Sequence, residues 1–199
     1  MARPMRRMLL AAVLVLTALA LGACGGDSGG SDAGGDQAEA DRVDARTWAE
    51  DVCGSARRWL DENQARSAEI QQGPAPSTPR EGREVVVRLV SEMVASGDEM
   101  VNEIEAAGTP DVDRGEEAQE GFVSLMQQLV DAFRTTEGEL AELPLDERFG
   151  EELQATMARM DERVDDIDYE QLEETTDPEL DALFDEIDDC QAVAANADS

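Results

Sequence analysis

Three cysteines are the residues of this chain whose type and spacing could do chemistry: Cys24, Cys53 and Cys190. A thiol can accept a lipid, form a disulfide, bind a metal or attack as a nucleophile. The chain contains no histidine, so the commonest general base and transition-metal ligand is missing. No CxxC spacing is present either, which makes a metal site or a reactive thiol the weaker interpretations of Cys53 and Cys190.

The segment before Cys24 has the plan of an export signal. Arg3, Arg6 and Arg7 form a positively charged start, and an apolar run over residues 8–21 follows. This run is too short for a stable transmembrane span, and small residues end it. We therefore expect the mature protein to be exported.

The four residues Leu21-Gly22-Ala23-Cys24 resemble the lipobox of bacterial lipoproteins. In that family the signal is cut before the cysteine, and the thiol receives a diacylglyceryl group. The resemblance implies a signal peptide over residues 1–23, lipidation of Cys24, and membrane attachment at the outer face of the bacterial cytoplasmic membrane. The alternative is an ordinary signal peptide that happens to end near a cysteine.

If Cys24 is lipidated, Cys53 and Cys190 remain as a pair in an oxidising compartment. They lie near the two ends of the expected folded region, so an intramolecular disulfide is their natural pairing. Closing so long a loop would stabilise the fold by up to about 5 kcal/mol in the chain-entropy model.

Charge restricts the partners that this chain can bind. It carries 47 acidic residues against 16 basic ones, a formal net charge of −31, and all the basic residues are arginine. No basic stripe for nucleic acid exists, and contact with anionic headgroups through the protein surface is unfavourable. The acidic surface keeps the protein soluble, or else attracts cations or a basic partner.

Carboxylates offer the remaining chemistry, but none forms a recognisable site. The run from Asp111 to Gly115 opens like a calcium loop, yet its glycine falls one place early and Phe122 replaces the bidentate acid. We expect Asp113 and Glu116 to start a helix instead. Residues 161–189 hold 15 acids, which we expect to form a solvated face. These like charges repel one another, and weak, diffuse binding of calcium or magnesium would relieve the repulsion. The sequence therefore predicts no catalytic residue and no defined metal site.

Helical periodicity dominates the rest of the chain. Residues 24–44 read as the lipidated cysteine and a flexible Gly/Ser/Asp tether, residues 45–193 as a helical bundle, and residues 194–199 as a frayed tail. Breaks rich in glycine and proline separate the expected helices. These helices run from about residue 45 to 72, 79 to 107, 113 to 142 and 149 to 167, with a short fifth from 178 to 190.

The predicted fold is an all-α antiparallel four-helix bundle with a short C-terminal fifth helix and one disulfide. The disulfide would bring the fifth helix across the first. Several methionines lie at core spacing and either fill the core or line a groove for an apolar ligand: Met93, Met100, Met126, Met157 and Met160.

The run from Ala106 to Val112, the helix bearing Trp48 and Cys53, and the late Cys190 resemble a group of small uncharacterised actinobacterial helical lipoproteins. The resemblance implies the anchor, the fold and the disulfide, and it transfers no activity. The leading hypothesis is a non-enzymatic surface lipoprotein that binds or scaffolds another envelope component. The alternative is a carrier or sensor of a small ligand or divalent cation, and no feature favours hydrolytic activity.

Overall fold

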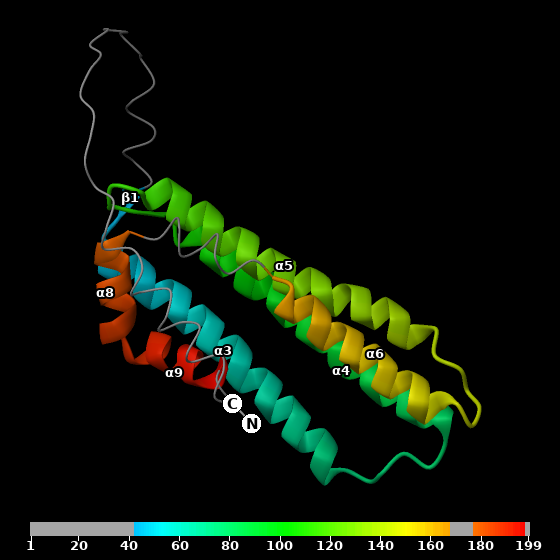
Figure 1. Cartoon of the computed structure of the whole chain (residues 1–199). Coiled ribbons are helices and arrows are strands. Elements are labelled where there is room, and N and C mark those ends of the chain that lie inside the picture. The colour runs from blue at the N-terminus through cyan, green and yellow to red at the C-terminus, as the bar shows by residue number, and fades with distance from the viewer. Residues whose placement is uncertain (1–41, 168–176, 198–199) are drawn as a thin grey trace, which may run out of the picture.

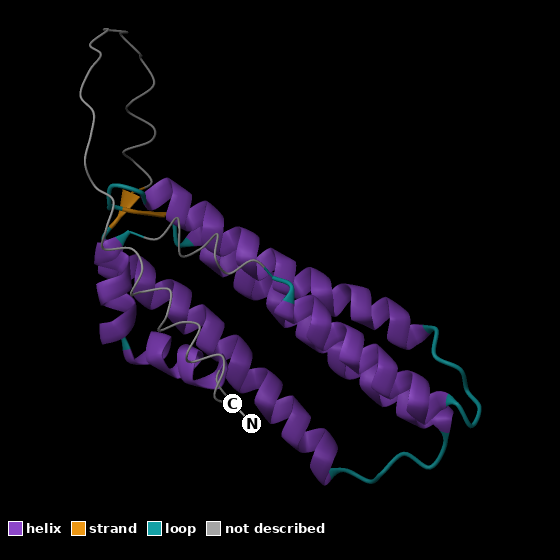
Figure 2. Cartoon of the chain, in the orientation of Figure 1, coloured by secondary structure: helices purple, strands orange, loops and turns teal. Residues whose placement is uncertain are grey.

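The computed structural model describes residues 42–167 and 177–197. Within these ranges the chain forms four long helices, α3 to α6, and two short C-terminal ones, α8 and α9 (Figures 1 and 2). Successive long helices run antiparallel, joined by short connections. The predicted all-α helical bundle is therefore confirmed. Across the described ranges, no helix combines the length and the apolar character needed to span a membrane.

Helix α3 (Ala45–Gln72) begins and ends where the sequence predicts. The Asp44 carboxylate accepts a hydrogen bond from the Thr47 backbone N–H at 3.0 Å, which satisfies one of the free donors of the first turn. Buried side chains then recur every three or four residues as far as Asn63, and the later turns are more exposed. One helix therefore has a buried half and a half-exposed half.

Helix α4 (Pro79–Ala106) starts with the predicted N-terminal cap. The Thr78 hydroxyl accepts from the Glu81 N–H at 3.2 Å, while the Glu81 carboxylate accepts from the Ser77 N–H at 2.7 Å. The reciprocal bond of a standard capping box goes to the cap residue itself, so this box is displaced by one residue. At the other end Gly108 has φ 80°, the left-handed conformation that favours glycine after a helix.

A two-stranded parallel pairing that no sequence pattern predicts lies beside the start of α3. Strand β1 (Arg42–Val43) pairs with β2 (Thr109–Pro110), and the Asp111 N–H donates to the Val43 carbonyl at 2.8 Å. Gly115 is required here, because a Cβ at this position would lie 2.0 Å from the Pro110 carbonyl oxygen. The pairing fixes where the chain enters the folded domain.

Helix α5 (Gly115–Ala141) begins later than predicted. Its N-cap is Arg114, and no side chain caps it, so the expectation that Asp113 caps this helix is wrong. The carboxylates of Glu116 and Glu117 in the first turn still suit the positive end of the helix dipole. The long-range pairing of β2 sets this start, and a local pattern could not reveal it.

Helix α6 (Phe149–Asp165) is the shortest of the four long helices and ends before Ile167, the predicted limit. The predicted short fifth helix is two helices, α8 (Pro178–Glu186) and α9 (Asp188–Ala197). Between them Ile187 is extended, with φ −84° and ψ 122°, and its side chain is buried. Helix α9 also continues through residues 194–197, where the sequence predicts a frayed tail.

Helices α8 and α9 cover the first half of α3, and we call this region of the hydrophobic core the disulfide end (Figure 1). Trp48 is fully buried there and packs edge-on against Phe122 at 5.4 Å and near Phe184 at 6.2 Å between ring centroids. Its indole N–H donates to the Gln119 side-chain oxygen at 2.6 Å. The large aromatic side chains therefore join α3, α5 and α8 in one cluster.

Candidate functional site

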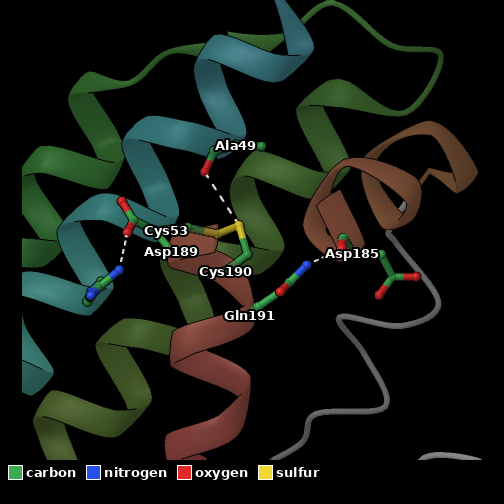
Figure 3. The surroundings of a disulfide bond; sticks show 7 residues. Ala49, Cys53, Asp185, Asp189, Cys190 and Gln191 are labelled. Carbon is green, nitrogen blue, oxygen red and sulfur yellow. Dashed lines mark hydrogen bonds and ion pairs between the residues drawn. A yellow bond between two sulfur atoms is a disulfide. The ribbon is translucent and has the colours of Figure 1, made fainter. Parts of the chain in front are cut away.

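The Cys53–Cys190 disulfide joins α3 to α9, as the sequence predicts. The two Cα atoms lie 4.9 Å apart across 137 residues of sequence, and both side chains are buried. The Cys190 sulfur lies 3.9 Å from the carbonyl oxygen of Ala49, which is one turn before Cys53 on α3 (Figure 3). An oxidised, buried cystine is neither a nucleophile nor a metal ligand, so its role here is to hold α9 in place.

Ion pairs support the same attachment of the C-terminal helices. Arg57 contacts Asp189 of α9 at 2.5 Å, and Arg46 contacts Glu186 of α8 at 2.5 Å. The side chain of Gln191 also donates to the Asp185 backbone carbonyl at 2.5 Å, across the break between α8 and α9 (Figure 3). These pairs are partly exposed and add little free energy individually, but they fix the register of α8 and α9 on α3.

The predicted lipidation site, Cys24, and residues 25–41 of its tether lie outside the described residues, as do residues 168–176 of the acidic run. Residues 42–44, which the sequence assigns to the flexible tether, instead form β1 and the N-cap of α3. In the described part of that run, burial together with the nearby Asp185 and Asp177 raises the pKa of Asp181. Across residues 42–167 and 177–197, no three metal-ligating side chains gather into a candidate metal site.

The segment that opened like a calcium loop forms a structural connection. Asp111 pairs with Arg42 at 3.1 Å, which ties this segment to the entry of the folded domain. Val112, the next residue, is buried. Asp111 therefore serves in an ion pair, and Asp113 is exposed rather than a capping residue.

A second polar cluster joins α5 to α6. Glu139 bridges Arg163 and Arg159, and Arg163 also donates to the buried Thr136 hydroxyl at 3.2 Å. Partial burial raises the pKa of Glu139, but the hydrogen bonds and charges of Arg163 and Arg159 outweigh it, so the net pKa is lowered. A carboxylate engaged by two guanidinium groups acts as a structural clamp, because its lowered pKa makes it a weak base and both arginines occupy its oxygens.

A groove lies at the opposite end of the described domain from the disulfide. It has a volume of about 920 Å³ and lies between the last turns of α3, the first half of α4 and the start of α6. We call this region the groove end. It is the concave apolar surface that a ligand site requires, and its volume falls within the usual range for small-molecule sites.

The groove has an apolar lining and a charged rim. Val86, Phe149 and Leu153 line it and also pack against the core. Ile70, Val85 and Leu89 line it as well; they are half-buried and lie outside the core cluster of the described residues. The charged groups of the lining are Arg66, Glu69, Arg88 and Glu92.

The methionines do not form this groove. Met100 is buried in the core, and Met93, Met126 and Met160 pack against it, so the core-filling interpretation is correct for these four. Met157 is half-buried on α6 and lies outside the groove lining. The residues that do line the groove include Ile70 and Leu89, whose helical spacing is indistinguishable from that of core residues. The sequence signal that could have indicated the groove is the proline-rich connection from α3 to α4. Such a segment cannot continue either helix, so it leaves the space between them uncovered.

No protein-family model, no curated protein and no solved structure matches this chain.

Proposed function

We propose that this chain is a non-enzymatic lipoprotein, held by lipid on Cys24 at the outer face of the cytoplasmic membrane, whose helical domain binds another component of the cell envelope. The Cys53–Cys190 disulfide is the observation that carries the proposal. Disulfides persist in exported proteins and are rare in reducing compartments. Lipidation occurs only on exported chains, so export supports the interpretation of the segment ending at Cys24 as a lipobox.

The binding role rests on the organisation of the described domain. The two most tightly held polar groups of the described domain, the Glu139 carboxylate between two arginines and the Cys53–Cys190 disulfide, have structural roles, which supports a binding function. What the domain offers instead is a braced helical body with an open groove at one end. A stable helical domain with an open groove favours a binding function over a catalytic one.

The anchor is tested by Cys24→Ser in the native host. We expect the variant to appear in the medium or to persist as uncut precursor, whereas the parent stays in the membrane fraction with the mass of a lipidated N-terminal cysteine. The double variant Cys53→Ser/Cys190→Ser is the matched control, because it replaces the other two cysteines and leaves the anchor. Retention of Cys24→Ser in the membrane as firmly as the parent would overturn the proposal.

A carrier function is the second candidate, and the groove favours it because Ile70, Val85 and Leu89 present apolar surface outside the core. Native mass spectrometry of protein purified from its host separates the two functions. A co-purifying small mass supports the carrier, and an empty domain with a protein neighbour in crosslinking supports the scaffold.

A further inference from the structure

We propose that the groove binds a free long-chain fatty acid, with its alkyl chain on the apolar lining and its carboxylate at Arg88. This proposal deepens the carrier function and rests on it, while ligand binding itself does not require the anchor on Cys24. Three features of the described residues carry it: the unpaired Arg88, the aliphatic lining, and the length of the groove.

Arg88 provides the anion-binding group. Among the described residues it makes no ion pair and no hydrogen bond, although it lines the groove of a chain with a net charge of −31. By contrast, Arg66 at the same end of the groove is already paired with Glu62 at 3.0 Å and with Glu92 at 3.7 Å. An unpaired guanidinium beside apolar surface is suited to a single carboxylate.

One of the two acids in the groove lining is already paired with an arginine. Glu92 is engaged by Arg66, and Glu69 is the other lining carboxylate. The lining therefore holds two cations and two anions, which makes it neutral within a strongly acidic chain. A ligand carboxylate meets less repulsion here than over the acidic faces of the domain.

The rest of the lining matches an alkyl chain. Val85, Leu89 and Ile70 are aliphatic, and the far end of the groove is formed by Pro74 and Pro76. Thr78 lies there too, but its hydroxyl already accepts the Glu81 N–H in the helix cap. A ligand that needs many directional hydrogen bonds, such as a sugar or a nucleotide, finds few free partners on this surface.

The length of the groove fits the same ligand. The part of the lining on α4 extends from Pro79 to Glu92, which at the rise of an α-helix corresponds to about 20 Å. This is close to the reach of an extended membrane-type fatty acid. Arg88 lies near one end of that span and the proline-rich connection near the other. The groove therefore has a charged end and an apolar end, which match the headgroup and the tail of an amphiphile.

The position of the groove favours a free monomer over a lipid taken from the bilayer. The chain enters the domain at Arg42, beside the first turn of α3, whereas the groove is formed by the last turns of the same helix. The residues between Ala45 and Arg66 correspond to about 30 Å of helix. The groove therefore opens at the end of the domain remote from Arg42.

The test uses the full chain as Cys24→Ser, which removes the protein's own acyl chains as competitors. Equilibrium dialysis with radiolabelled palmitate should give one binding site per chain. Methyl palmitate, which lacks the carboxylate, should bind about tenfold more weakly, the loss expected for one charge-assisted hydrogen bond. Release of the Cys24→Ser chain from cells is scored separately, so a failure of the anchor and a failure of the ligand are distinguishable.

Two matched pairs of variants locate the ligand. Arg88→Gln should weaken palmitate binding about tenfold. Arg80→Gln should leave it unchanged, because Arg80 is also exposed on α4 without an ion pair among the described residues but lies outside the groove lining. Leu89→Gln should weaken binding to a similar extent, whereas Leu145→Gln, at an exposed leucine outside the lining, should not.

The proposal is overturned if palmitate does not bind while thermal melting shows a folded chain, or if Arg88→Gln and Arg80→Gln weaken binding equally. Equal affinity for palmitate and its methyl ester would also overturn it. So would a photocrosslinker at position 89 that joins a protein and no fatty acid in living cells, because the groove would then be a docking site for a partner.

Discussion

The two ends of helix α3 show how one helix can serve both a closed core and an open surface. At the disulfide end Trp48 has no exposed surface and contacts aromatic rings from α5 and α8. At the groove end Ile70 is half-exposed, because α8 and α9 lie against the earlier turns and α6 lies against α5. The covering helices account for part of this difference, and the composition of α3 accounts for the rest, because residues 61–72 hold only Ala65, Ala68 and Ile70 as apolar side chains.

This asymmetry separates stability from binding. The disulfide end has a covalent link, two ion pairs and an aromatic cluster between helices that are far apart in sequence. The groove end has apolar residues that lie outside the core. A domain braced at one end can leave surface open at the other without losing its fold.

The largest expected effect is from Trp48→Ala. It removes the largest fully buried side chain and leaves the Gln119 amide oxygen without its donor, so we expect a loss of about 3–5 kcal/mol in the free energy of unfolding. Ile70→Ala on the same helix should cost less than about 1 kcal/mol, because that side chain is half-exposed and outside the core. Urea denaturation measures both, and equal losses would contradict the distinction between the two ends.

Removal of the disulfide comes next. Cys53→Ala/Cys190→Ala should lower the free energy of unfolding by about 2–4 kcal/mol, since the bond closes a loop of 137 residues. Hydrogen exchange of the backbone amides should become faster in α8 and α9. The amides of α5 and α6 near Glu139 should slow or speed only as much as the overall free energy of unfolding changes. Uniform loss of protection across the domain would show that the bond braces the whole fold and not one end.

Two glycines of α4 offer a matched pair, one at each end. A Cβ at position 97 would lie 2.7 Å from the buried Val130, and one at position 82 would lie 2.8 Å from the ring of the half-buried Phe149. Gly97→Ala should destabilise by about 1–2 kcal/mol, because Val130 cannot move within the core. Gly82→Ala should be nearly neutral, since the ring can shift toward the groove and alanine favours the helix. The reverse order in thermal melting would mean that the groove end is the more rigid.

The smallest effect concerns pH. The pKa of Asp181 is raised by burial and by nearby acids, so the folded state binds a proton more tightly at this carboxylate than the unfolded state does. The stability that this group contributes is therefore present below the unfolded pKa and is lost as pH rises through the folded pKa. Asp181→Asn should raise the melting temperature by about 1–2 °C at pH 7. The gain should vanish below the ordinary aspartate pKa, and an equal gain at all pH values would assign it to another cause.

The beginnings of α3 and α4 could be read from the sequence because their causes are local. Asp44 and Thr78 each cap a backbone N–H three residues later, and Gly108 supplies the left-handed conformation after α4. The start of α5 could not be read in this way, since the pairing of Val43 with Pro110 sets it from a distant part of the chain. The break between α8 and α9 at Ile187 also could not be read from the sequence, because this residue is buried by contacts with the rest of the fold.

The sequence by itself determined the all-α fold and the pairing of Cys53 with Cys190, because helical periodicity, caps and the count of cysteines are properties of the chain alone. Only the tertiary structure decided which apolar positions are core and which are groove. Trp48 and Ile70 share the same helical spacing, and nothing in that spacing says where the covering helices end. Burial depends on the neighbours that the fold brings together, and for Ile70, Val85 and Leu89 those neighbours leave one side open.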